Sequence, residues 1–404
     1  MNQQEAAGPA EDRIDLVDAL RGLALLGILL ANITVFSGWV FLSDEGRAAL
    51  AGSEVASAQS ALHRLVVDGK FYTLFSLLFG AGFALQLERL TRRGADGVRI
   101  LRRRMLILLA IGLVHQWVIW DGDILVLYAL LGLLLPAFRT LSDRALLAWG
   151  AVLIFAVPLA GVALVQAMGW APDAGLMGLS DRIAKAIADV DPSQTIEWVR
   201  REDLRARLAW LASGPLFAWA FKLMSWRIPK VLGIMLLGLW IGRRLAAGTL
   251  VGDRRLLRRV LVTGGIVGIP LSVLYALQQD ASQSGWQSLL GTVPLALGYA
   301  AGFVLVWPRA KAMLGVLAWP GRMALTNYLM QSVICVITFY GLGLGFAGYW
   351  PPAGFYAFAI AVFAAQTMFS RWWLQRHAQG PMEALWRRWT YPARRPLTGP
   401  AATV

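Results

Sequence analysis

The sequence contains very few cysteine and histidine residues. Its 404 residues include one cysteine, Cys335, and three histidines. A single cysteine excludes a disulfide framework and a Cys-based metal site, and we expect no metal because the histidines are dispersed. The sequence also lacks a Walker loop, a HExxH zinc motif and a G-x-S-x-G nucleophile elbow.

Charged residues are also scarce, at 15% of the chain, where soluble domains have about a quarter. Hydrophobic residues make up 57%, and they gather in long runs of the length that bilayer-spanning helices need. The net charge of +14 comes from arginines that flank these runs, so we expect no nucleic-acid partner. The composition predicts an all-α, polytopic bundle of integral membrane helices in contact with membrane lipids.

The apolar runs predict about ten membrane spans, at residues 17–42, 68–89, 101–120, 122–139, 145–168, 229–246, 258–278, 286–307, 321–343 and 352–374. Three arginine-rich segments, 89–104, 243–259 and 371–395, are expected in the cytoplasm, because cytoplasmic loops carry an excess of lysine and arginine. Together these segments predict that both termini are cytoplasmic.

One further apolar segment, 204–226, is long enough to cross the membrane. A single crossing there would move the arginine-rich segment 243–259 to the outer side, so we predict an interfacial or re-entrant helix. The predicted organisation is therefore a cytoplasmic N-terminus (1–16), five spans (17–168), an outer-side insertion (169–228), five further spans (229–374) and a basic cytoplasmic tail (375–404).

Charged groups at the start of the first span form the first candidate site. Asp15, Asp18 and Arg21 recur at the helical spacing i, i+3 and i+6, so Asp18 and Arg21 can pair on one face. Ionisable groups leading into a span are costly and usually belong to a protein-lined site, which indicates chemistry or an ion-paired gate. Asn32 follows in the same span, and Arg322 opens the ninth span, where it can hold a phosphate.

His115 is the second candidate. It lies eleven residues beyond Arg104, about 16 Å along a helix, and therefore deep in the third span. An ionisable side chain there is a functional candidate by default, and the alternative is a packing histidine bonded to another helix. Asp121 and Asp123 frame a glycine in the following loop. In one interpretation the two residues form a polar turn, where Asp-Gly is favoured. In the other, one of the two carboxylates orients His115 or binds an acceptor hydroxyl.

Three further polar side chains each allow two interpretations. Lys70 either extends its ammonium group to the interface or adds a cation to the site. Asn327 and Gln331 lie one helical turn apart, so they either hydrogen bond to another helix or line a reaction chamber. The remaining histidines, His63 and His377, fall in polar surroundings, where we expect them to be solvated.

Several segments resemble the YeiB-like family of bacterial inner-membrane proteins, the group defined by domain of unknown function 418. The matching segments are 15–22 (D-L-V-D-A-L-R-G), 71–80, 112–115, 122–125, 321–328 (G-R-M-A-L-T-N-Y) and 380–387 (G-P-M-E-A-L-W-R). They follow one another along nearly the whole chain. The resemblance implies a multi-pass protein of the bacterial inner membrane.

The D-x-x-R-G start of the first span is also similar to that of transmembrane acyltransferases. Among these are lysosomal heparan glucosaminide N-acetyltransferase and bacterial O-acyltransferases of cell-surface sugars. The similarity implies an acyl-CoA or acetyl-CoA donor from the cytoplasm. It implies a hydroxyl or amine acceptor, on a sugar, lipid or small metabolite, at the outer side. By this similarity His115 would be the catalytic histidine. The predicted catalytic residues are His115 and, from their position in the following loop, Asp121 and Asp123.

Acyl transfer is chemically consistent with these residues. It needs a base or a nucleophile, which His115 would supply, and hydrogen-bond donors for a developing oxyanion. The donor's phosphates would meet the arginines of the inner rim, so we expect a cavity that opens to the cytoplasm and is lined by Arg21 and Arg322. The predicted substrate- and donor-binding residues are Asp15, Asp18, Arg21, Asn32, Lys70, Arg322, Asn327 and Gln331.

Two other classes of protein stay open. A transporter or flippase of an anionic lipid or small solute would use Asp15, Asp18 and Arg21 as a charge gate. The grouping of the acidic residues at helix ends favours the enzyme. The third class is a catalytically idle assembly or sensor protein, and a homodimer is compatible with all three.

Overall fold

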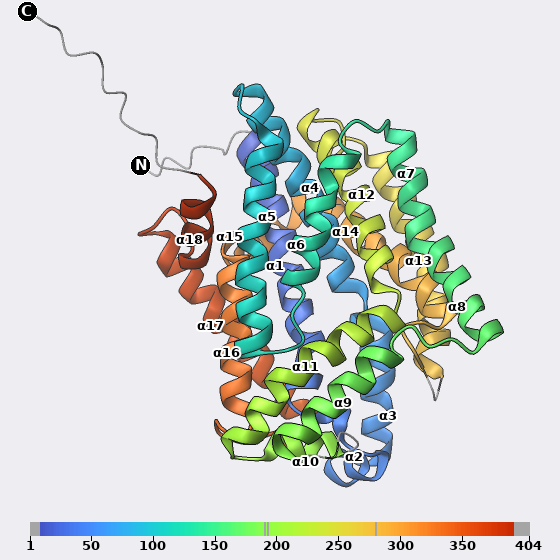
Figure 1. Ribbon diagram of the computed structural model, residues 1–404. Helices are drawn as coiled ribbons and strands as arrows, with labels where there is room; N and C mark the ends of the chain where they lie inside the picture. Colours follow the sequence, from blue (N-terminus) through green and yellow to red (C-terminus); the bar gives the residue numbers. More distant parts are fainter. Residues whose placement is uncertain (1–8, 190, 192–193, 279–280, 392–404) are drawn as a thin grey trace, which may run out of the picture.

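The computed structural model describes residues 9–189, 191, 194–278 and 281–391. All regular secondary structure in these ranges is helical, which confirms the predicted all-α class (Figure 1). The outermost parts of the two predicted terminal segments, residues 1–8 and 392–404, lie outside the described ranges.

The N-terminal part of the bundle ends its first helix at a glycine turn. Gly38 has a φ of 74°, a left-handed conformation that favours glycine. Two π-helical turns, His63–Val67 and His115–Ile119, interrupt the helices that follow, and such turns are frequent at functional sites. The helices here are α1 (Pro9–Phe36), α2 (Asp44–Ala51), α3 (Ser53–Leu62), α4 (Lys70–Arg92), α5 (Gly97–Val114) and α6 (Leu125–Leu134).

The middle part contains the predicted insertion at 169–228, which folds as three helices. Two of them, α9 and α11, pack against each other. A third π-helical turn, Val152–Ala156, joins α7 to α8. The helices here are α7 (Asp143–Ala151), α8 (Val157–Met168), α9 (Ala174–Ala188), α10 (Thr195–Arg200), α11 (Leu204–Met224) and α12 (Arg227–Ala246).

The C-terminal part contains one helix whose bounds equal those of a predicted span, 352–374, and one that is longer than predicted. The second of these is α14, which extends past the predicted residue 307 to Leu314. The helices are α13 (Arg254–Leu277), α14 (Trp286–Leu314), α15 (Ala318–Arg322), α16 (Ala324–Phe339), α17 (Pro352–Leu374) and α18 (Pro381–Thr390).

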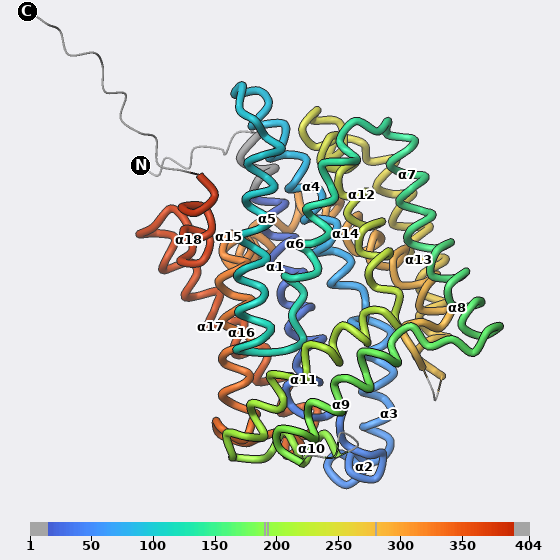
Figure 2. The backbone as a smooth tube through the Cα atoms, viewed as in Figure 1, coloured from blue at the N-terminus to red at the C-terminus, as the bar shows by residue number. Residues whose placement is uncertain are grey.

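The long helices run back and forth between two ends of the bundle, as the chain path in Figure 2 shows. One end, which we call the arginine end, carries the loops at 93–96, 139–142 and 247–253 together with α18. Arg243 of α12 binds the loop at 139–142, because its guanidinium donates to the carbonyl oxygens of Leu141 and Arg139, each at 2.7 Å. The other end, the pocket end, carries α2, α3, α9, α10 and α11.

Within the described part of the chain, six helical stretches are long and apolar enough to cross a membrane, at residues 15–36, 53–92, 143–168, 254–277, 286–322 and 352–374. The helices α11 and α12 raise the number to seven if they act as one span, but they are bent by 69° where they meet. The predicted interfacial or re-entrant segment 204–226 is thus the first arm of a bent pair. These lengths and compositions mark the chain as a multi-pass membrane protein.

Two helices, α4 and α12, pack closely against each other. Gly80 of α4 faces the backbone of α12, where a Cβ would collide with the carbonyl oxygen of Met235. Gly82, two residues further on, faces open space. Close approach of small residues is a common way to pack helices in lipid.

Candidate functional site

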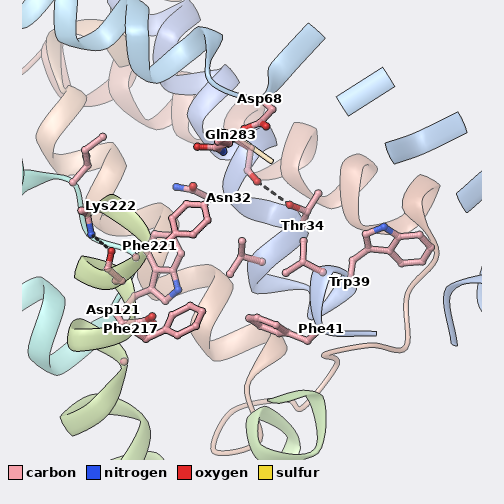
Figure 3. A pocket seen from close by; sticks show the side chains of 18 of the residues that line it. Asn32, Thr34, Trp39, Phe41, Asp68, Asp121, Phe217, Phe221, Lys222 and Gln283 are labelled. Carbon is pink, nitrogen blue, oxygen red and sulfur yellow. Dashed lines mark hydrogen bonds between the residues drawn. The ribbon is translucent and has the colours of Figure 1, made fainter. Parts of the chain in front are cut away.

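A pocket of about 820 Å³ lies at the pocket end of the bundle (Figure 3). Its walls come from the loop between α5 and α6 and from ten helices: α1, α2, α3, α4, α9, α10, α11, α12, α13 and α16. Segments far apart in the sequence therefore meet here, and polar and aromatic side chains share the lining. Pockets of this size and mixed lining are typical of small-molecule sites.

A buried histidine–carboxylate pair stands beside this pocket. His115 Nδ1 lies 2.7 Å from Asp123 Oδ2, and the two side chains are 1% and 0% exposed. Asp123 is fixed from a second direction, because its Oδ1 accepts a hydrogen bond from the backbone N–H of Val126 at 2.7 Å and so caps α6. Of the two carboxylates in the Asp-Gly-Asp loop, Asp123 is the one that contacts the histidine.

The second nitrogen of the imidazole is left free. With Asp123 accepting from Nδ1–H, the neutral ring carries its lone pair on Nε2. Nε2 is buried and has no hydrogen-bond partner among the described residues. The His115 ring lies 5.2 Å from the ring of Tyr328 and 6.5 Å from that of Trp120, measured between centroids. Asp123, Trp120 and Tyr328 line the pocket, so His115 stands directly behind this wall.

The other carboxylate of the loop faces the pocket itself. Asp121 Oδ1 accepts a hydrogen bond from Trp210 Nε1 of α11 at 2.9 Å, and Asp121 is part of the lining. Gly214 of α11 packs against it, since a Cβ there would lie 2.9 Å from the Asp121 Cβ. The bent α11 thus covers the loop that carries both carboxylates.

Lys222 and Arg227 are among the cations of the lining that were not expected from the sequence. Lys222 of α11 is 4% exposed, and its ammonium donates to the carbonyl oxygen of Ala218 at 3.3 Å. Arg227 begins α12 and donates to Gln283 Oε1 at 2.6 Å. A signal was available, because Lys222 interrupts the apolar segment 204–226 and Arg227 follows at its end.

The π-helical turn before α4 adds further polar groups. His63, which we expected to be solvated, lines the pocket with its Nδ1 2.9 Å from the hydroxyl of Tyr356. Lys70 is fully buried and donates to the carbonyl oxygen of Arg64, so it does not extend to an interface. Asn32 of α1 is the predicted binding residue that lies in the lining together with Asp121 and Asp123.

The charged groups of the first span lie at the other end of α1. Arg21 pairs with Asp18 at 2.5 Å, as the helical spacing predicted. Arg322 contacts Asp15, and its Nε lies 3.5 Å from Asp18. About 21 Å of helix separates Asp18 from Asn32, so this ion-pair cluster is remote from the pocket. The pocket at the opposite end includes neither Arg21 nor Arg322 in its described lining.

Asn327 and Gln331 connect helices. Asn327 Nδ2 donates to Ser370 Oγ of α17 at 2.9 Å, and Gln331 Nε2 donates to Gln366 Oε1 at 3.0 Å. Gln366 in turn donates to the carbonyl oxygen of Asn327 at 3.0 Å. Of the two interpretations that the sequence left open, this geometry is the interhelical one.

Three of the segments that resemble a known family meet at the arginine end. Glu383 of α18 accepts hydrogen bonds from the backbone N–H groups of Leu325 and Thr326 at 2.7 and 3.1 Å, and from the Thr326 hydroxyl at 2.6 Å. Gly321 packs on the carbonyl oxygen of Asp18, where a Cβ would collide. The tail, the segment 321–328 and the start of α1 therefore form one assembly.

The fold and the site define a class: multi-pass helical membrane proteins with a buried histidine–carboxylate pair beside a mixed polar pocket. The chain belongs to the DUF418 family, whose model, described as "Protein of unknown function (DUF418)", matches residues 241–393. This confirms the resemblance found in the sequence.

Relatives match almost the whole chain. The chain is 33% identical over 409 residues to "Uncharacterized protein YeiB" of Escherichia coli (strain K12), covering 94% of this chain and 97% of that one. It is 32% identical over 396 residues to "Uncharacterized protein YxaH" of Bacillus subtilis (strain 168), covering 96% of each. Both alignments extend well beyond the region that the family model matches, so the N-terminal helices belong to the family as well.

Proposed function

We propose that the chain is a membrane acyltransferase that moves an acyl group from acyl-CoA or acetyl-CoA to a hydroxyl or amine of an acceptor bound in the pocket. The observation that carries this proposal is the buried His115–Asp123 pair, which leaves Nε2 as a free base beside the pocket. A carboxylate that fixes the tautomer and stabilises the imidazolium is the arrangement by which the Ser-His-Asp triad activates a hydroxyl.

The His115–Asp123 pair can accept and return the proton that the reaction moves. The acceptor's proton passes to His115 Nε2 as its oxygen adds to the thioester carbonyl, and the carbon–sulfur bond then breaks. The CoA thiolate takes the proton back from the imidazolium, which Asp123 stabilises meanwhile. Asn32 in the lining would donate to the oxyanion that develops on the carbonyl.

Access to Nε2 requires a small movement of the wall. Nε2 is enclosed, and the rings next to His115 belong to Trp120 and Tyr328. A rotation of either ring would admit the acceptor, and apo geometry at catalytic histidines commonly tightens only with substrate. The closed wall would keep water from the base until the acceptor is bound.

The proposal includes a topology. The bundle would cross the membrane ten times, through α1, α4, α5, α6, α7 with α8, α12, α13, α14, α16 and α17. The arginine end and both termini would face the cytoplasm. The donor would then enter from the arginine end, with its phosphates at Arg21 and Arg322 once these release Asp15 and Asp18. The acceptor would enter the pocket from the outer side.

The test uses membranes from cells that express the full chain, supplied with acetyl-CoA labelled in its acetyl group. Wild-type membranes should move label from CoA into a membrane or soluble product. His115→Ala should lower this transfer by about 10²- to 10⁴-fold, the usual contribution of a general acid–base. The matched control is His377→Ala, because His377 stacks on Trp373 at 4.1 Å and is remote from the pocket. Full transfer by His115→Ala membranes would refute the assignment.

A transporter is the second candidate, because α1 connects an ion-pair cluster at one end to a pocket at the other. The same membranes separate the two functions. Label that crosses the membrane of sealed vesicles while still attached to CoA or its original carrier would favour transport. Label found covalently on a new product would favour the enzyme.

A further inference from the structure

Five cations gather around Tyr72 and the inner wall of the pocket: Arg64, Lys70, Lys222, Arg227 and Lys230. Arg227 lies over the Tyr72 ring at 4.9 Å and Lys230 lies 6.0 Å from it, while Lys70 lies 6.0 Å from the ring of Tyr275. Lys70, Lys222 and Lys230 are all buried. Placing this many cations together in a membrane protein is costly unless an anion joins them.

The protein's own hydrogen bonds do not neutralise this cluster. Arg64 and Lys222 donate to the carbonyl oxygens of Gln278 and Ala218, and Arg227 donates to the side-chain amide of Gln283. These acceptors carry no net charge. One nitrogen of Arg227, Nε, is buried without a hydrogen-bond partner in the described part of the chain.

Three of the carboxylates that line the pocket accept hydrogen bonds from neutral groups or from His115. Asp68 accepts from the Tyr275 hydroxyl and the Gln283 amide, each at 2.6 Å. Asp121 accepts from Trp210, and Asp123 accepts from His115 and from a backbone N–H. Neither Lys222 nor Arg227 forms an ion pair with these three carboxylates, so both have donors for a ligand.

An apolar surface adjoins these two cations. Phe221 precedes Lys222 on α11 and packs under the Arg227 guanidinium at 5.2 Å. Figure 3 shows Phe217 and Phe41 further along the same cavity, with Asn32 between the aromatic groups and Asp68. An acid group at Lys222 and Arg227 would thus be continuous with room for a hydrocarbon portion.

We propose that the acceptor is an anionic amphiphile, whose phosphate or carboxylate binds Lys222 and Arg227 and whose apolar part packs on Phe41, Phe217 and Phe221. The term acceptor rests on the proposed acyl transfer, whereas the binding itself does not. Arginine and lysine together suit such a group, since arginine offers a planar fork of donors and lysine a compact charge.

Binding is measured by calorimetric titration of the full chain in nanodiscs of neutral lipid. The probes are dodecyl phosphate, dodecanoate, inorganic phosphate and the uncharged dodecyl maltoside. Dodecyl phosphate or dodecanoate should bind at least tenfold more tightly than inorganic phosphate and dodecyl maltoside. Equal binding of inorganic phosphate would mean a small soluble anion, and equal binding of the maltoside would mean that charge is irrelevant. Either result overturns the proposal.

The variants test which residues bind the acid group. Lys222→Met and Arg227→Met should each weaken dodecyl phosphate binding by about 10- to 100-fold, as expected when a charge-assisted hydrogen bond is lost. Lys222→Arg should retain binding, which separates loss of charge from loss of fold. The matched control is Arg47→Met, because Arg47 lines the same pocket but pairs with Asp44 at 2.6 Å. Unchanged binding in both Met variants would contradict the site.

Two further measurements distinguish the proposed binding of an anionic amphiphile from the proposed acyl transfer. His115→Ala should bind dodecyl phosphate as the wild type does, so lost transfer with intact binding bears on the chemistry alone. Acetyl-CoA and CoA should not compete with dodecyl phosphate. Competition by CoA would show that the cations hold the donor's phosphates, and the assignment to the acceptor would then be wrong.

Discussion

Asp123 has two tasks, and they use different oxygens. Oδ2 contacts the imidazole of His115, and Oδ1 caps the first turn of α6 through Val126. Because the cap fixes the side-chain conformation of Asp123, its carboxylate is already oriented toward the imidazole of His115. A conservative change at this residue can therefore alter the charge on one oxygen while leaving the cap in position.

Asp123→Asn tests this separation. The amide oxygen can keep the cap, and the amide NH₂ then faces Nδ1, which favours the tautomer with its proton on Nε2 and removes the base. We expect kcat for label transfer to fall by about 10²- to 10⁴-fold with KM little changed. Asp143→Asn, at the arginine end, is the matched control. A rise in KM together with the fall in kcat and a lost thermal transition would instead indicate damage to α6.

At the level of elements, α4 and α12 depend on close backbone contact. Gly80 faces the Met235 carbonyl, and a backbone atom cannot rotate away as a side chain would. Gly82 lies on the same helix with open space before it. The two positions differ in surroundings but share residue type and helix.

We expect Gly80→Ala to destabilise the bundle by about 1–3 kcal/mol, the usual cost of overpacking. Gly82→Ala should be neutral or slightly stabilising, because alanine favours the helix over glycine. Thermal unfolding of both variants in the same detergent measures the difference. Equal transition temperatures would show that α4 and α12 can move apart at no cost.

The elements were predictable where one local pattern determines them. The apolar run at 352–374 coincides with α17, and the i, i+3 spacing of Asp18 and Arg21 gave their ion pair. The pocket was not predictable in this way. Asp68 meets Gln283 across 215 positions, and no local period encodes such a contact. The 69° bend that brings Lys222 and Arg227 to the pocket likewise depends on packing.

At the scale of the whole molecule, the two ends differ in chemistry. The arginine end is held by contacts such as those of Arg243 and Glu383, while the pocket end is covered by α9, α10 and α11. A chain with this polarity has one orientation in the membrane if the excess of arginine decides it.

Reporter fusions after residues 95, 180 and 250 and at the C-terminus measure this orientation. We expect inside, outside, inside and inside, because residues 95 and 250 lie in arginine-rich segments and the C-terminus follows another, 371–395. An inside signal at residue 180, within α9, would place the pocket end in the cytoplasm. The acceptor could then not enter the pocket from the outer side, as the proposal requires.

The contact between Glu383 and the start of α16 also concerns the order in which the protein is made. Leu325 and Thr326 leave the ribosome nearly 60 residues before the carboxylate that accepts from their N–H groups. Until then the first turn of α16 lacks its acceptor, and free N–H groups are poorly tolerated in lipid. The arginine end can therefore close only after α18 has been made. A nascent chain truncated before α18 would present an unfinished helix start to the membrane insertion and quality-control machinery.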